Sequence, residues 1–124
     1  MLYVLEESTL PYVIQNPQHI LYGTIWIIIH KVNNKIIGDV GFKGAPSSKG
    51  LIEVGYGIYP EYRKNGYMSE ALNLIVKWAF DQKDVLIIIA ETDKSNVGSQ
   101  MTLQRTQFEC FAETEMAYWW RLDK

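Results

Sequence analysis

The sequence predicts an α+β fold with α/β-like layers, in which a mixed β-sheet is covered by a few helices. Short apolar segments with the alternation typical of strands recur along the chain, separated by Gly, Pro and Asn. One segment with helical periodicity lies between two of these strand segments. The chain has 124 residues, of which 48% are hydrophobic, and these values predict one domain over residues 1–124.

Charge and cysteine content exclude several classes of protein. The formal net charge of −2 gives no strongly basic face, so we expect no nucleic-acid and no membrane partner. The apolar run at residues 25–30 is far shorter than the roughly 20 residues of a spanning helix, and the first residues lack the basic region of a signal peptide. Cys110 is the only cysteine, which fits a reducing compartment, and we expect a cytoplasmic protein. On an alternating strand, Cys110 is interpreted as a small core residue rather than a nucleophile.

The first part of the chain predicts a hairpin. Residues 1–16 are ambiguous, and our interpretation is one short helix broken near Pro11. From Thr24 to Val32 a β-branched and aromatic run predicts a strand, followed by a tight turn at residues 33–35. Lys35–Lys43 is then expected to be its antiparallel partner.

A third strand is predicted over residues 51–59, and Pro60 closes it. Alternation gives this strand two faces. One face carries Ile52, Val54, Tyr56 and Ile58, and the other carries Glu53, Gly55, Gly57 and Tyr59. Two glycines on one face indicate either a bulge or the close approach of a ligand.

The second half of the chain predicts a crossover between parallel strands. Apolar residues recur at helical spacing from Met68 to about Gln82, which predicts an amphipathic helix. The continuously apolar residues 85–91 predict a buried strand. A strand, a helix and a strand in this order imply a right-handed crossover, with the two strands parallel or nearly so.

The C-terminal part predicts a second helix and a last hairpin. The helix is expected from Asn96 to Gln107, and the residues expected to face inward are Val97 and Met101, with Leu103 and Thr106 as further candidates. Residues 108–113 and 116–122 alternate and predict the hairpin. The hairpin aromatics, Tyr118, Trp119 and Trp120, could line a binding site or form a homodimer contact, although their alternation favours packing.

The loop YRKNGYMSEA, residues 62–71, is the first candidate for a binding site. It leaves a strand and enters a helix, so it presents the unpaired N-terminal amides and the positive end of the helix dipole. Arg63 and Lys64 add charge, and Gly66 lets the backbone approach a ligand closely. These features favour a diphosphate, while a solvated polar turn is the alternative. The sequence contains neither a Walker motif nor a dinucleotide fingerprint.

The stretches IEVGYGIYPEYRKNGYMSEALNLIVKWAF and ETDKSNVGSQMTLQRTQFE resemble the GNAT superfamily of N-acetyltransferases, in particular its RimJ/RimL-like branch. The resemblance extends from about Thr24 to the C-terminus and implies a mixed, largely antiparallel sheet flanked by helices, with an abbreviated N-terminus. Its most specific part is the acetyl-CoA motif Q/R-x-x-G-x-G/A, which here begins at Arg63 and ends at Met68, where the motif has a small residue.

The resemblance implies acetyl-CoA as the co-substrate and no metal. In the family, the amides of this loop hold the pyrophosphate and the preceding strand pairs with the pantetheine arm, which would also explain the two strand glycines. The cofactor-binding residues carried over are Ile58, Tyr59, Arg63, Lys64, Asn65, Gly66, Tyr67, Met68, Ser69 and Asn96. Asn96, or Ser95 beside it, is equally expected as a helix cap, and capping and cofactor contact are compatible.

The resemblance also supplies candidate catalytic residues. Ser99 matches a position near the thioester sulfur and is the candidate for stabilising the leaving thiolate; Leu103 lies where other branches place an acidic Tyr, and it cannot donate a proton. Glu91 is the preferred general base and Glu53 the second choice, with solvated strand-end acids as the alternative for each.

These residues predict transfer of an acetyl group to a primary amine by direct attack, without a covalent enzyme intermediate. The acceptor is left open among a protein N-terminus, a small polyamine and an amino sugar. The alternative is a catalytically silent CoA-binding interaction or sensor module, suggested by the abbreviated N-terminus, Met68 and the missing Tyr.

Overall fold

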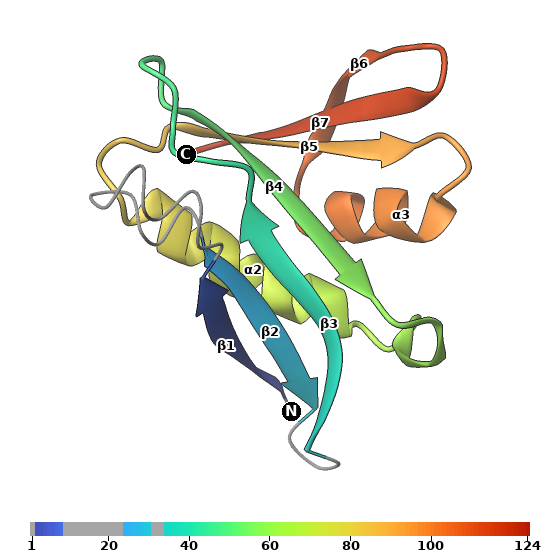
Figure 1. Cartoon of the computed structure of the whole chain (residues 1–124). Coiled ribbons are helices and arrows are strands. Elements are labelled where there is room, and N and C mark those ends of the chain that lie inside the picture. The colour runs from blue at the N-terminus through green and yellow to red at the C-terminus, as the bar shows by residue number, and fades with distance from the viewer. Residues whose placement is uncertain (1, 9–23, 31–33) are drawn as a thin grey trace.

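The computed structural model describes residues 2–8, 24–30 and 34–124. Within these ranges, seven strands form one sheet in the order β1-β2-β3-β4-β5-β7-β6 (Figure 1). The strands are β1 (Leu2–Ser8), β2 (Thr24–His30), β3 (Lys35–Phe42), β4 (Leu51–Ile58), β5 (Ile87–Asp93), β6 (Glu109–Glu113) and β7 (Ala117–Asp123). The helices are the short 3₁₀ helix η2 (Pro60–Tyr62), α2 (Tyr67–Phe80) and α3 (Val97–Arg105).

The sheet is mixed and mostly antiparallel, which confirms the predicted fold class. Among the described strands, only β4 and β5 pair in parallel, as the order of strand, helix and strand predicted. This parallel pairing runs only from Leu51 opposite Ile87 to Glu53 opposite Ile89. Beyond these residues β4 pairs with β3 alone, and β4 and β5 diverge (Figure 1). The divergence is the feature of the fold that positions the site described below.

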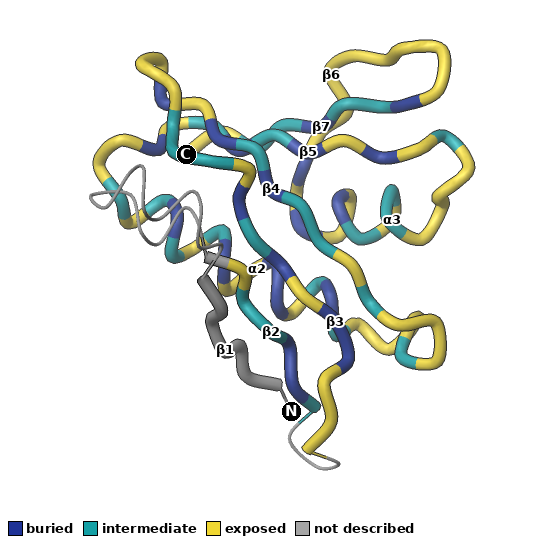
Figure 2. Tube along the Cα trace, viewed as in Figure 1, coloured by how far each residue is buried: buried dark blue, intermediate teal, exposed yellow. Residues whose placement is uncertain are grey.

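The core lies between one face of the sheet and the helices. The predicted face of β4 supplies Ile52 and Val54, each 2% exposed, and Tyr56 and Ile58 pack partly buried against the same cluster. The buried residues of α2 are Met68, Ala71, Leu72, Ile75 and Ala79. Leu103 of α3 belongs to the same cluster, so both helices contribute to the core. Figure 2 shows buried positions recurring along the strands and along α2.

The interpretation of the N-terminus as a helix is wrong for residues 2–8. They form β1, which pairs antiparallel with β2 from Leu2 opposite His30 to Ser8 opposite Thr24. The backbone of this segment gains its hydrogen bonds from β2, a tertiary partner that local sequence does not reveal. The remainder of the ambiguous stretch, including Pro11, lies outside the described residues, as do residues 31–33 at the predicted turn.

The inward face of α3 differs in part from the prediction. Leu103 is fully buried and Thr106 is 4% exposed, as expected, whereas Val97 and Met101 are 60% and 44% exposed. The helix buries only Leu103 along its length, so its C-terminal half makes the buried contact with the core. The periodicity identified the helix but not which part of it reaches the core.

The last hairpin forms as predicted, and its two strands differ in burial. Trp120 is 5% exposed and donates a hydrogen bond from Nε1 to Thr92 Oγ1 at 2.9 Å, which confirms packing for this residue. Cys110 is exposed, so its interpretation as a core residue is wrong. It lies on β6, which is an edge strand whose residues are all exposed. No described helix is long and apolar enough to cross a membrane.

Candidate active site

A cleft of about 360 Å³ opens where β4 and β5 diverge. It is lined by Lys43, Val54, Gly55, Tyr56, Glu91, Thr92, Asp93, Asn96 and Ser99. Three of the residues proposed from the sequence, Glu91, Asn96 and Ser99, therefore meet at one place, although they come from β5 and the start of α3. The loop at residues 63–66 and Glu53 are not among the lining residues.

The edge of β4 that faces the cleft has unpaired backbone groups. The bonds Lys43 N to Glu53 O and Tyr59 N to Ile37 O, both 2.8 Å, direct the odd-numbered residues of β4 toward β3. Because alternate residues of a strand direct their backbone groups to opposite sides, Tyr56 and Ile58 direct theirs toward β5. The pairing with β5 has already ended at Glu53, so this edge is open to an extended ligand. Tyr59 N–H is used by β3, and only its side chain, 51% exposed, remains available.

Ser99 is held in place from two directions. Its backbone N–H donates to Asn96 Oδ1 at 3.1 Å, which makes Asn96 the N-cap of α3, as one of the sequence alternatives proposed. Its Oγ lies 2.8 Å from the hydroxyl of Tyr56, which also lies 3.4 Å from the Ser99 carbonyl oxygen. Burial raises the pKa of Tyr56 to about 12, although the hydrogen bond with Ser99 acts in the opposite direction.

Sequence reasoning missed Tyr56 as a site residue. The strand pattern placed it among core residues, and its ring is indeed packed against the core. The available signal was that Tyr56 carries a hydroxyl on a face otherwise made of Ile and Val, because a half-buried phenol normally finds a polar partner. The identity of that partner depends on the approach of α3, which local sequence does not show.

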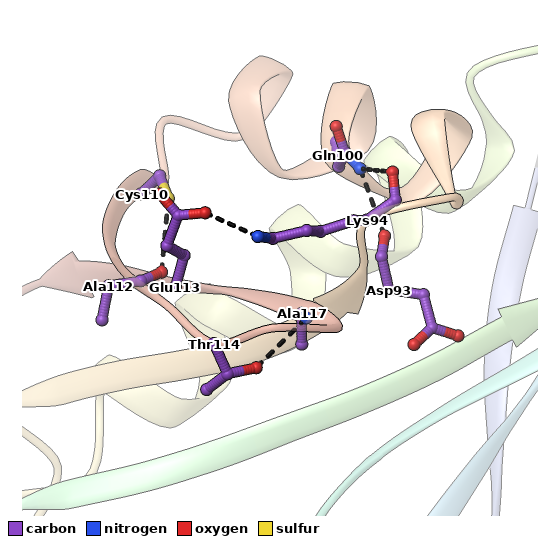
Figure 3. A network of polar contacts seen from close by, with 8 residues as sticks. All are labelled: Asp93, Lys94, Gln100, Cys110, Ala112, Glu113, Thr114 and Ala117. Atoms are coloured by element: carbon purple, nitrogen blue, oxygen red, sulfur yellow. Dashed lines mark hydrogen bonds and ion pairs between the residues drawn. The ribbon is translucent and has the colours of Figure 1, made fainter.

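A second network holds the segment between β5 and α3 (Figure 3). Gln100 Nε2 donates to the carbonyl oxygens of Asp93 and Lys94, at 3.1 Å each. Lys94 Nζ forms an ion pair of 2.6 Å with Glu113 of the last hairpin, and this contact raises the pKa of Lys94. These contacts connect the end of β5, which lines the cleft, to α3 through Gln100 and to β6 through Glu113.

The two candidate bases have different surroundings. Glu91 is exposed and lines the cleft. Glu53 forms an ion pair with Lys43 at 2.8 Å, and its side chain is 22% exposed. The Lys43 side chain also lies over Gly55, where a Cβ would come 3.3 Å from Lys43 Cε. The space over this glycine is therefore occupied by a side chain of the protein, and the β3–β4 pairing has no bulge there.

The loop before α2 has the features of an anion site. Arg63, Lys64, Asn65 and Gly66 are all exposed, and neither cation forms an ion pair with another described residue. The loop is shaped by left-handed backbone at Lys64 (φ 66°) and at Gly66 (φ 77°), and the second position favours glycine for this reason. No side chain caps α2, so the amides of its first turn, at Tyr67, Met68 and Ser69, are open to a ligand.

Two side chains of the first turn of α2 point away from that anion site. Met68 stands where the acetyl-CoA motif has a small residue. Its side chain is 5% exposed and packs in the core cluster, so it does not fill the loop. Tyr67 forms a hydrogen bond of 2.9 Å between its hydroxyl and His30 Nε2 of β2. For both residues, only the backbone amide is therefore available to a ligand at the loop, because the side chain is engaged elsewhere. The described residues contain no group of three His, Cys, Asp or Glu that could hold a metal ion.

A model of the acetyltransferase (GNAT) domain matches residues 7–109 of this chain. The chain therefore belongs to the GNAT acetyltransferase family. It is 39% identical over 83 residues to the uncharacterized N-acetyltransferase YjdG of Bacillus subtilis, a match that covers 67% of this chain and 49% of YjdG. A second B. subtilis relative, the uncharacterized N-acetyltransferase YoaA, is 29% identical over 70% of this chain and 49% of its own. The chain thus spans about half the length of these relatives.

Solved structures share the fold. The ribosomal-protein-S5-alanine acetyltransferase from Vibrio fischeri matches with a TM-score of 0.79 and 22% identity, over 92% of this chain and 68% of that one. Campylobacter jejuni N-acetyltransferase PseH, crystallised in complex with acetyl coenzyme A, matches with a TM-score of 0.66 and 24% identity, over 82% and 67% of the two chains. The predicted fold and family are thereby confirmed.

Proposed function

We propose that this domain is an acetyl-CoA-dependent N-acetyltransferase that transfers the acetyl group to a primary amine by direct attack. The observation that carries the proposal is the arrangement around β4. The open edge of β4 borders the cleft at Tyr56 and continues to Ile58, and the uncapped N-terminus of α2 follows the same strand after a short loop. An amide-bearing pantetheine arm suits a strand edge, and a diphosphate suits a helix N-terminus beside two cations.

The co-substrate proposal has independent support from a fold neighbour. PseH holds acetyl coenzyme A in a domain of the same fold. In this chain we assign the pyrophosphate to the amides of the first turn of α2, with Arg63 and Lys64 supplying charge. Asn65 is engaged within the loop, since its Nδ2 donates to the carbonyl oxygens of Tyr62 and Arg63 at 3.3 and 3.0 Å, and it stabilises the loop shape.

The lining of the cleft suits acetyl transfer to an amine. The amine must lose a proton, and the leaving thiolate must be stabilised, since a free thiol such as that of cysteine has a pKa of about 8.5. Glu91 is our candidate for the proton acceptor because it lines the cleft and reaches water. Glu53 is the second candidate, because its carboxylate is engaged by Lys43 at 2.8 Å and it is not among the residues that line the cleft. Ser99 is the candidate hydrogen-bond donor to the thiolate.

The acceptor we propose is a protein N-terminus or a small amine such as a polyamine or an amino sugar. Two carboxylates, Glu91 and Asp93, line the cleft and would attract a protonated amine before it is deprotonated. We place the protein in the cytoplasm, which suits the exposed, unpaired thiol of Cys110.

Amine-dependent release of free CoA thiol tests the proposal. With a panel of peptide N-termini, polyamines and amino sugars, we expect release above background for at least one amine, confirmed by mass spectrometry of the acetylated product. Glu91→Gln should lower the rate by about 10²-fold or more, because a general base contributes on that order. Glu115→Gln, at an exposed turn outside the cleft, is the matched control.

The silent CoA-binding module makes a different prediction for the same assay. Under this alternative, acetyl-CoA binds but no amine in the panel is acetylated. Glu91→Gln should then leave the background release of thiol unchanged. That pattern would contradict the enzyme proposal and leave the binding site intact.

A further inference from the structure

We propose that Tyr56 is a positioning residue whose hydroxyl donates a hydrogen bond to Ser99 Oγ, so that the Ser99 hydroxyl hydrogen points at the thiolate leaving from CoA. The inference rests on the proposed function and adds a residue that no sequence motif assigned. Its geometric basis is the 2.8 Å contact between the two hydroxyls, at residues that both line the cleft. The Asn96 cap fixes the backbone of Ser99, so the Tyr56 contact sets the remaining freedom of the side chain.

The direction of this hydrogen bond follows from the chemistry of the two groups. A phenol is the stronger acid and so the better donor, whereas an aliphatic hydroxyl accepts readily through its lone pairs. Tyr56 keeps its hydrogen at neutral pH, since an ordinary phenol has a pKa of about 10, and burial raises the pKa of Tyr56 further, to about 12. When Tyr56 donates, Ser99 is free to direct its own hydrogen elsewhere, and a hydroxyl that already accepts a hydrogen bond is a stronger donor.

The charges around the cleft offer little stabilisation to a thiolate. The lining contains one cation, Lys43 at the end of β3, and two carboxylates on β5, Glu91 and Asp93. The lining residues of β4 and α3 carry no charge. Lys43 is already paired with Glu53, so the nearby charges disfavour a thiolate. The Ser99 hydroxyl, supported by Tyr56, is a neutral group in the cleft that can offset this effect by hydrogen bonding.

The chemical step is balanced without a proton from either hydroxyl. The amine nitrogen forms the new C–N bond, the C–S bond breaks, and the electron pair leaves on sulfur. The amine proton passes to Glu91 or to water, while the thiolate accepts the hydrogen bond from Ser99 and later takes a proton from solvent. Tyr56 and Ser99 keep their protons throughout, so they lower the barrier by stabilising charge.

The pKa of the CoA thiol bound to the protein tests the role of Tyr56 without turnover. It can be measured from the ultraviolet absorbance of the thiolate during a pH titration of the complex. In the wild type we expect a value below that of free CoA titrated under the same conditions. Tyr56→Phe and Ser99→Ala should each raise it by roughly one unit, and the double variant should raise it no further, because the two residues act as one unit.

Steady-state kinetics give the matching readout. Tyr56→Phe should lower kcat roughly tenfold with little change in the KM for acetyl-CoA, since the hydroxyl acts on the departing charge. Tyr118→Phe removes a phenol from β7 outside the cleft and should change neither quantity. Fluorotyrosine at position 56 keeps the fold in case Tyr56→Phe does not, and its more acidic phenol should lower the thiol pKa further.

Several results would overturn the inference. A bound thiol pKa equal to the free value, a thiol pKa unchanged by Tyr56→Phe and by fluorotyrosine, or additive effects of Tyr56→Phe and Ser99→Ala would each exclude it. In those cases CoA still binds, and the proposed function stands. A wild-type protein that does not bind CoA at all would instead remove both proposals.

Discussion

Helices α2 and α3 hold their N-termini in opposite ways. Helix α2 buries five residues but has no side-chain cap, whereas α3 buries only Leu103 and is capped by Asn96. A helix held by packing can leave its first amides open for a ligand, because its stability does not depend on satisfying them locally. A helix with little packing needs its cap and side-chain contacts to hold a residue such as Ser99 at the cleft. The comparison predicts three kinds of effect. Substitutions of buried residues in α2 should change stability, substitutions at its N-terminal loop should change binding, and substitutions at the cap of α3 should change the position of Ser99.

The largest expected effect comes from weakening the packing of α2. Leu72 is fully buried, and Leu72→Ala should lower the free energy of unfolding by about 2–5 kcal/mol. Leu74→Ala on the same helix is the matched control, because Leu74 is 49% exposed, and it should cost well under about 1 kcal/mol. Urea denaturation measures both. Equal losses would mean that packing does not hold α2, and the comparison would fail.

The open N-terminus of α2 should matter for binding and not for stability. The double variant Arg63→Ala/Lys64→Ala removes two exposed cations, and we expect the Kd for acetyl-CoA to rise on the order of tenfold to a hundredfold. The free energy of unfolding should change by less than about 0.5 kcal/mol. Isothermal titration calorimetry at low and high salt measures the loss, which should shrink as salt screens the charges. Lys49→Ala, in an exposed loop, is the control; an equal weakening by it would argue against a local anion site.

The burial of the Tyr56 hydroxyl should appear as a component of alkaline stability. The folded-state pKa of Tyr56, about 12, lies above the value of about 10 in an unfolded chain. The stability from the neutral phenol is therefore complete below about pH 10 and falls by about 1.4 kcal/mol per pH unit between about pH 10 and 12, where only the folded state keeps the proton. Chemical denaturation across this pH range measures the free energy of unfolding. That free energy should fall less steeply with pH for Tyr56→Phe than for the wild type or Tyr118→Phe. Parallel curves for all three proteins would contradict the burial of the hydroxyl.

The smallest effect concerns the cap of α3. Asn96→Ala should cost about 1 kcal/mol of stability and loosen Ser99, whose N–H donates to Asn96 Oδ1. Asn96→Asp keeps the acceptor and should restore most of the loss. Ser95→Ala, next in the chain and exposed, should have no comparable effect. Thermal unfolding measures all three, and a loss in Ser95→Ala as large as that in Asn96→Ala would mean that the cap is shared.

The parts of the fold that sequence reasoning identified are those whose signal is local. The alternation over residues 51–59 placed Ile52 and Val54 in the core correctly, and the helical spacing after Met68 identified α2. The strand at Leu2–Ser8 and the exposed face of α3 were missed because each depends on a partner distant in sequence. Periodicity states which residues share a face, but only tertiary packing decides how much of that face is covered.

The loop before α2 could be predicted from the sequence, whereas the Tyr56–Ser99 pair in the cleft could not. Gly66, Arg63 and Lys64 belong to a contiguous loop, so a motif could describe them. Their predicted contact with the cofactor stays a prediction, as do the roles of Glu91, Glu53 and Ser99. The Tyr56–Ser99 pair joins a strand and a helix 43 positions apart, and no local pattern encodes that contact.

The measurement that tests the central claim most directly is the thermal midpoint of the purified protein with and without acetyl-CoA. A ligand at 100 times its Kd adds about 2.7 kcal/mol to the stability of the folded state, which is several degrees for a domain of this size. We predict such a rise with acetyl-CoA, no rise with NAD or ATP, and a smaller rise in the Arg63→Ala/Lys64→Ala variant. No rise at about millimolar acetyl-CoA would contradict the claim that the β4 edge and the α2 N-terminus form a CoA site.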